Sequence, residues 1–298
     1  MENIITIEEF DPKNIVLNNP TKNTHGGTVI PIHYQCPRRG KIPFILKPPK
    51  CELPYGVSQF PTADKVVKGE ENKVNYSLNI SFAGFDNKFA KNPKVGMFFK
   101  KWKKMENYIH TQLVKNSKKF LKDNIKSVDV MEKMCWPIVK HSKDKDGEVT
   151  NKYPPTFSIK LPRYGKDGAE PLFSTKLIND KGCESKLVVG PTDKESNEFN
   201  VHESFPRYSE VRTLIQCTSL QKVAKLSMSF KVIQAKVFPG KNQISGNAFA
   251  DDSDDDEPEK APVEESEDEA EEADGGEESG EESGEESDEA EVDDSDSE

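Results

Sequence analysis

Aromatic residues stand beside basic residues at several places in this chain. The groups are Tyr34 with Arg38 and Arg39, Phe44 with Lys47 and Lys50, Lys152 with Tyr153, and Arg163 with Tyr164. An aromatic face can stack on an unpaired nucleobase for about 1–3 kcal/mol while neighbouring cations hold the phosphates. A single aromatic of this kind is more often a core residue. As a group near predicted loop ends, however, they favour a nucleic-acid-binding surface.

Lysine outnumbers arginine by 36 to five within residues 1–250. Lysine is a mobile point charge suited to phosphates, whereas arginine supplies the planar fork that reads guanine. The balance therefore favours contact with a nucleic-acid backbone without base readout. Further lysines fall on predicted outward faces of strands, namely Lys160, Lys225, Lys231 and Lys236.

Motifs for catalysis are missing from the sequence. It contains no GxxxxGK[ST], since Ile42 follows Gly40-Lys41, and no HExxH or GxSxG. A metal site built from His25, His33, Cys36 and Cys51 would match no common zinc spacing. The five cysteines form no CxxC pair, so free thiols are expected. We expect no enzyme, no cofactor and no metal.

Residues 251–298 form an acidic tail with 28 Asp and Glu against one Lys, a net charge of −27. The preceding 250 residues carry a net charge of +16. Charge runs are commonly solubility tails. Here the opposite charge of the body predicts that the tail competes for the surface that a phosphate backbone would occupy. The composition predicts a disordered tail, joined by a flexible linker over 239–250.

The periodicity of apolar residues predicts a mainly β chain with one long helix. Residues 74–82 and 156–161 alternate as strands with one buried face, and apolar residues from Pro93 to Phe120 recur at helical spacing. Residues 1–27 and the loop up to about residue 65 are expected to be irregular, apart from strands at 28–34 and 42–46. The other expected elements are a short helix at 128–134, a strand at 134–140, a hairpin turn in 142–152, weak strands within 171–189, and strands at 211–220 and 225–238.

Two details of the last strand matter for function. Leu226, Met228, Phe230 and Val232 form an apolar stripe, and lysines and serines face away from it. The adjacent Val232 and Ile233 break the alternation, which predicts a β-bulge.

Several stretches resemble a known family. YPPTFSIKLP, preceded by PIVKHSKDKDGEVTNK, together with LIQCTSL, LSMSFKVIQAKV and the helix NPKVGMFFKKWKKM, is similar to the single-stranded-DNA-binding proteins shared by nucleocytoplasmic large DNA viruses and short-tailed phages. The resemblance covers roughly residues 28–238. It implies an OB-fold barrel with an inserted helix that binds single-stranded DNA in replication and recombination. Phage members end their acidic tail on an aromatic residue that docks partners, whereas this chain ends in SDSE.

We therefore expect an OB-fold-like β-barrel domain over 1–238, with its core at about 28–238. Its expected function is sequence-tolerant binding of single-stranded DNA in replication, recombination and repair, with the tail docking a polymerase, helicase or primase. An acidic-tailed histone chaperone and a general nucleic-acid packaging protein stay open as alternatives, as does a homodimer. The acidic start and the lack of a long apolar run predict no membrane span and an intracellular location, in a nucleus or viral replication factory.

Overall fold

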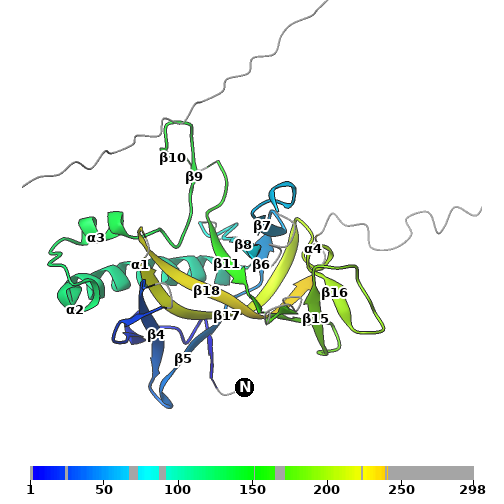
Figure 1. Ribbon diagram of the computed structural model, residues 1–298, viewed down its shortest axis with the longest axis horizontal. Coiled ribbons are helices and arrows are strands. Elements are labelled where there is room, and N and C mark those ends of the chain that lie inside the picture. The colour runs from blue at the N-terminus through cyan, green and yellow to red at the C-terminus, as the bar shows by residue number, and fades with distance from the viewer. Residues whose placement is uncertain are drawn as a thin grey trace, which may run out of the picture. The chain divides into compact units, whose positions relative to one another are not determined.

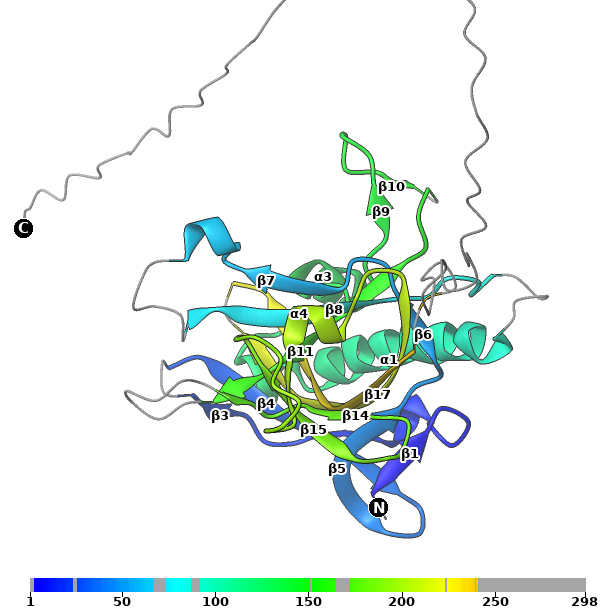
Figure 2. The same cartoon turned by 90° about the vertical axis from the view of Figure 1, so that its right-hand side faces the viewer.

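A closed barrel of five strands is the centre of the computed structural model (Figures 1 and 2), which describes residues 3–23, 26–66, 73–86, 92–150, 152–164, 172–222, 224–238 and 240. Around the barrel the strands are β6 (Cys51–Leu53), β8 (Asn75–Ser81), β11 (Thr156–Leu161), β18 (Leu226–Phe238) and β17 (Ser209–Lys222), which pairs again with β6. Counted along the chain, this order is 1-2-3-5-4. β11 and β18 are parallel, and the other neighbours are antiparallel. The predicted OB-type barrel is confirmed.

The apolar side chains that alternate along the strands fill the interior of the barrel, as predicted. Ile80 lies opposite Phe157 and Leu78 opposite Ile159 in the β8–β11 pair, and all four side chains are buried. Since successive side chains of a strand point to opposite faces, the residues between them face outward. The predicted bulge is also confirmed. Ile215 pairs with Val232 whereas Leu214 pairs with Gln234, so Ile233 is the extra residue.

Helix α1 (Pro93–Lys115) lies between the second and third barrel strands in the chain and packs against the barrel core. The Asn92 side chain accepts a hydrogen bond from the Lys94 N–H, and Pro93 occupies the first turn, where its missing N–H costs nothing. The Trp102 ring centroid is 5.4 Å from that of Phe157 and 5.3 Å from that of Phe230. The predicted long helix is thus confirmed, and α2 (Ser117–Leu121) and the predicted short helix α3 (Val128–Met134) follow it. In the described part of the chain, no helix is long and apolar enough to cross a membrane.

The N-terminal segment is not irregular, contrary to the sequence-based expectation. β1 (Ile4–Thr6) pairs in parallel with β5 (Gly40–Lys47), while β2 (Ile15–Leu17) and β3 (Thr21–Lys22) pair with β4 (Thr28–Cys36). The Lys101 ammonium fixes the segment to α1 by donating to the carbonyl oxygens of Ile7 and Glu8, each at 2.8 Å. Strands of two or three residues are too short to show a period in the sequence.

Two further expectations need correction. The presumed loop before residue 65 contains β6 and the short strand β7 (Val57–Phe60), which pairs with β8. Residues 134–140 form no continuous strand, because only Cys135 and Lys140 make isolated bridges to neighbouring strands. The predicted hairpin follows as β9 (Ser142–Lys143) and β10 (Val149–Thr150), with Gly147 at a φ of +86° in the turn.

The remaining elements are the 3-10 helices η1 (Pro12–Asn14) and η2 (Ala63–Lys65), β12 (Arg163–Tyr164), β13 (Leu172–Phe173), β14 (Lys176–Ile178), β15 (Glu184–Val188), β16 (Glu198–Asn200) and α4 (Val201–Ser204). Of these, β14, β15 and β16 extend the sheet beyond the barrel, and β12 and β13 pair as a separate two-stranded sheet. By its internal contacts the chain divides into Met1–Asn247 and Ala248–Glu298, and every described residue belongs to the first unit. The predicted tail and all of the predicted linker except Gly240 lie outside the described residues.

Candidate nucleic-acid interface

Two lysines stand side by side on the outer face of the barrel. Lys160 of β11 lies opposite Ser77 of β8 on one side and Lys231 of β18 on the other. Residues that oppose each other in a sheet point to the same face. On the same face Asn79 Nδ2 donates a hydrogen bond of 3.0 Å to Ser58 Oγ. The outer surface here is therefore built from small polar groups with two cations.

Next to these lysines the barrel strands separate. β11 and β18 pair at Lys160 and Lys231, and their N-terminal ends diverge, leaving an opening that residues 135–140 cross. The Trp136 N–H donates to the Leu226 carbonyl at 2.7 Å, at the start of β18. Lys140 exchanges two backbone hydrogen bonds with Thr156, of 2.7 and 2.9 Å, at the start of β11. We call residues 135–140 the strap.

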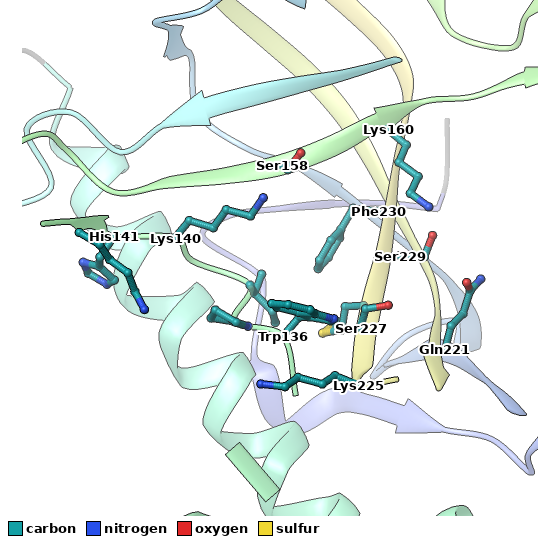
Figure 3. A pocket seen from close by; sticks show the side chains of 14 residues that line it. Trp136, Lys140, His141, Ser158, Lys160, Gln221, Lys225, Ser227, Ser229 and Phe230 are labelled. Carbon is teal, nitrogen blue, oxygen red and sulfur yellow. The ribbon is translucent and has the colours of Figure 1, made fainter. Parts of the chain in front are cut away.

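A groove of about 700 Å³ lies between the strap and the two strands (Figure 3). Lys140, Lys143, Lys160 and Lys225 line it, and no aspartate or glutamate is among its lining residues. Small hydroxyls from Ser158, Ser227 and Ser229 form much of its polar surface, together with Gln221 and His141, and the apolar lining comes from Trp136, Pro137, Ile138, Met228 and Phe230. The groove therefore combines positive charge with an aromatic and apolar floor.

Trp136 is the large aromatic side chain that this groove leaves open to solvent. It is 57% exposed, although its backbone is fixed by the bond to Leu226. Lys225 Nζ lies 5.1 Å from the centroid of the indole ring. Figure 3 shows the ring in the middle of the groove, between the Lys225 and Lys140 side chains. A cation held over an indole face is attracted by the ring, and this contact keeps the lysine at the groove.

Helix α1 holds the strap from behind. Glu106 is 3% exposed, and its Oε1 accepts a hydrogen bond of 2.6 Å from the Ile138 N–H. Its Oε2 accepts from Lys103 Nζ at 2.8 Å. Both oxygens of this buried carboxyl group are thus hydrogen bonded, which offsets the cost of burying them. Burial, reinforced by the charge of Lys103, lowers the pKa of the neighbouring His141, so this groove residue is neutral at neutral pH.

Three of the predicted binding residues meet at or beside the groove. Lys160 and Lys225 line it, and Lys231 is the register neighbour of Lys160. Lys152 and Tyr153 lie just before β11, where Lys152 Nζ is 5.5 Å from the Tyr153 ring centroid and that tyrosine is 56% exposed.

Arg163 and Tyr164 lie just past the other end of β11. The Arg163 guanidinium is 5.3 Å from the ring centroid of the buried Tyr76 and 5.5 Å from that of Phe173. It therefore packs against the barrel, whereas Tyr164 is exposed.

The predicted group around Phe44 is separated from the groove, and a stacking role for Phe44 itself is wrong. Its ring is 1% exposed and packs against Phe10 and Tyr34 at centroid distances of 5.2 and 5.6 Å. The alternation of β5 turns this ring inward. Arg38 and Arg39 are exposed in the turn between β4 and β5, which Figures 1 and 2 place at the opposite end of the barrel from β9 and β10. A hydrogen bond from Arg39 lowers the pKa of the Cys36 thiol there.

Three more predicted lysines lie away from the groove lining. Lys47 is exposed at the end of β5. Lys50 forms a salt bridge of 2.6 Å with Glu210, and Lys236 forms one of 3.1 Å with Asp180. Both ammonium groups also lie over the Phe238 ring, at 4.9 and 5.5 Å from its centroid. Their charges are partly neutralised within the protein.

The groove residues that sequence reasoning missed come mainly from the strap. Trp136, Lys140 and His141 fall in or beside a stretch that was expected to be a strand. Trp136-Pro137 and Lys140 were visible as an aromatic near a lysine, the same signal as at Tyr153. Their exposure depends on the separation of β11 and β18, which no local pattern encodes. Among the described residues, no His, Cys, Asp and Glu side chains gather in a group of three or more that could hold a metal. His25, one of the four candidate metal ligands, lies outside those residues.

No protein-family model matches this chain, and no curated protein matches it in sequence. Three solved structures of phage proteins have a low similarity to it. The single-stranded DNA-binding protein from bacteriophage Enc34 is 12% identical. Its structure in complex with ssDNA has a TM-score of 0.29 and covers 74% of this chain and 93% of that chain. A second structure of the same phage protein has a TM-score of 0.31 and covers 80% of this chain and 99% of that chain. Gp2.5, a single-stranded DNA-binding protein encoded by bacteriophage T7, is 12% identical with a TM-score of 0.28 over 74% and 100%. Similarity at these scores says nothing about the site, so the candidate interface is supported by its own geometry alone.

Proposed function

We propose that this protein binds single-stranded DNA with little sequence preference, in the groove between β11, β18 and the strap. The observation that carries the proposal is an exposed tryptophan, Trp136, among four lysines and no carboxylate. Its open face is suited to stacking on a base, which every base permits because each has a π-face. The lysines are suited to phosphates as point charges, which read no sequence.

The outer face of β11 extends this surface along the barrel. Tyr153 precedes the strand and Tyr164 follows it, both exposed, with Lys160 between them. From residue 156 to residue 164 an extended chain covers about 26 Å, at roughly 3.3 Å per residue. In OB-type barrels the face of the second and third strands, here β8 and β11, and the loop between the fourth and fifth commonly bind oligonucleotides. β11 supplies Ser158 and Lys160 to the groove, and the loop between the fourth and fifth strands supplies Lys225.

Stacking on Trp136 requires unpaired bases, so the test compares single-stranded with duplex DNA. We expect wild-type protein to prefer the single strand, with log K falling linearly against log salt by about 0.7 for each phosphate contact. Trp136→Ala should weaken single-strand binding by about 5- to 150-fold, the equivalent of the 1–3 kcal/mol of one stacked base. Equal or tighter binding to the duplex would overturn the proposal.

Tyr208→Asn provides a matched control. Tyr208 is an exposed aromatic at the far end of β17 from the groove residue Gln221, and asparagine tolerates its φ of +62°. We expect this variant to bind as the wild type does. If both substitutions weaken binding equally, the groove is not the binding site.

We further propose that the protein acts in replication, recombination and repair, because these processes expose single strands. The acidic tail would then dock basic surfaces of a polymerase, helicase or primase, inside a nucleus or viral replication factory. Membership of the viral and phage single-stranded-DNA-binding family belongs to the same proposal. The histone-chaperone alternative would place binding on the tail, so histone binding without any preference for single-stranded DNA would favour it. Binding RNA or duplex equally well would favour a packaging protein.

A further inference from the structure

A second basic surface lies at the C-terminal end of α1. A hollow of about 520 Å³ opens there, and its lining residues are Val114, Lys115, Asn116, Ser117, Lys118, Lys119, Asn124, Ile125 and Lys126. Four of the nine lining residues are lysines, and none is an aspartate or glutamate. We call this feature the basic hollow.

The turn that forms the basic hollow is fixed by buried groups. Ser117 Oγ donates to the Ile125 carbonyl oxygen and accepts from the Ile125 N–H, both at 3.2 Å. Lys122 adopts the left-handed backbone with a φ of +58°, which ends α2 and turns the chain back. Phe120 and Leu121 are buried beneath the turn. The lysines are thus displayed from a backbone whose course is set by packing and hydrogen bonds.

The four lysines of the basic hollow outnumber the single acidic residue in its turn. In the described part of the chain, Lys115, Lys118 and Lys126 make no ion pair, unlike Lys50 and Lys103 elsewhere. The one acidic residue in the turn, Asp123, accepts a hydrogen bond of 2.8 Å from the Asn124 N–H. Like charges held close together repel, and a polyanion relieves that repulsion while releasing its own counterions.

We propose that the basic hollow binds the phosphodiester backbone of the same DNA strand that occupies the groove, so that the binding site has two parts. This inference rests on the proposed function. The two parts lie on one scaffold, because Glu106, which holds the strap, and Lys115 are nine residues apart on α1, or about 14 Å at 1.5 Å per residue. The hollow is suited to the backbone rather than to bases, since none of its lining residues is aromatic and the adjacent Phe120 is buried.

The two parts are separate patches, which makes the inference testable by DNA length. The two linings share no residue, and α3, which lies in the chain between Lys126 and the strap, exposes Asp129 and Glu132, which repel phosphate. A strand that fills only the groove should not sense the basic hollow. OB folds occupy about 4–16 nucleotides, so a short oligonucleotide of about 6 and a long one of about 25 separate the cases.

The experiment measures binding of both lengths by the full-length chain carrying Lys118→Gln and Lys126→Gln. Both side chains are exposed, so folding should be unaffected. We expect affinity for the short oligonucleotide to stay at the wild-type value and affinity for the long one to fall several-fold at low salt. The slope of log K against log salt for the long one should become shallower by about 0.7 for each of the two lost contacts.

The control carries Lys181→Gln and Lys194→Gln, which remove the same charge from exposed positions in the turns on either side of β15. Figure 1 shows β15 and β16 across the barrel from α2. The basic hollow is not a DNA contact if the hollow variant and the control have the same affinity for the long oligonucleotide. The same conclusion follows if the hollow variant loses as much affinity for the short oligonucleotide as for the long one. If the wild type binds neither length, the proposed function fails and this inference fails with it.

Discussion

At the scale of single residues, the exposed ring of Trp136 contributes less to stability than a buried ring would. Burying a large apolar side chain is worth about 1.5–3 kcal/mol, and here much of that stabilisation is given up, because the ring is 57% exposed. The strap that carries it depends on the buried side chains of Cys135 and Val139, on backbone bonds to Leu226 and Thr156, and on Glu106. Both apolar packing and a few polar groups therefore set its position.

Glu106→Ala tests that dependence. The substitution leaves the Ile138 N–H without its acceptor and Lys103 without its partner, so we expect the free energy of unfolding to fall by about 1–3 kcal/mol. Affinity for single-stranded DNA should fall as well, because the strap no longer holds Trp136 in one place. Glu106→Gln keeps an acceptor for Ile138 and should retain most of the affinity. Urea unfolding and oligonucleotide titration measure the two effects. Equal losses of affinity for the two variants would show that this hydrogen bond does not position the strap.

At the scale of secondary structure, α1 carries two buried polar residues one turn apart, Glu106 and His110. Burial lowers the pKa of His110 below its usual 6.5, reinforced by Lys103 and opposed by Glu106 and Glu132. Burial also lowers the pKa values of His33 and His141. The folded protein therefore keeps these imidazoles neutral at a pH at which the unfolded chain protonates them.

A lowered histidine pKa makes the unfolded state bind more protons, so stability rises with pH in that range. The contribution of His110 is fully present above pH 6.5 and is lost as the pH falls through its folded-state pKa. We expect the free energy of unfolding, measured in urea between pH 8 and pH 5, to decline below about pH 6.5. His110→Gln should make that decline shallower, with His33 and His141 supplying the rest. An unchanged pH slope in the variant would contradict this role, whatever its absolute stability.

Periodic elements could be predicted from the sequence, whereas the strap could not. Three strands, β8, β11 and β18, have one exposed face for much of their length. The alternation of apolar and polar residues therefore shows which of their side chains face the core. The same reasoning located Lys160, Lys225 and Lys231. The strand that contains Phe44 also alternates, but the sequence does not show which of its faces is buried. Phe44 lies in the core. The strap is placed by the bond of Trp136 to Leu226, 90 residues away, and by the pairing of Lys140 with Thr156, and such contacts leave no local pattern.

The whole molecule is divided by charge into a body of +16 over residues 1–250 and a tail of −27 over residues 251–298. Within the described residues the lysines that line the groove and the basic hollow make no ion pair, while Lys50, Lys176 and Lys236 pair with carboxylates. Under the proposed function, we expect a polyanion tethered to such a body to compete with DNA phosphates by charge alone, which requires no defined contact.

Deleting residues 251–298 should therefore raise the affinity for single-stranded DNA. Joined through residues 239–250, the tail has an effective concentration on the order of millimolar near the body, so its removal frees lysines from a strong competitor. The gain should be largest at low salt and small at high salt, because screening weakens tail and DNA contacts alike. Titrations across salt concentrations measure it. A chain of the same length with the tail's Asp and Glu replaced by Asn and Gln is the matched control and should behave like the deletion. If the deletion gains affinity and the neutral tail does not, the tail acts by its bulk, and an unchanged affinity at low salt would exclude competition altogether.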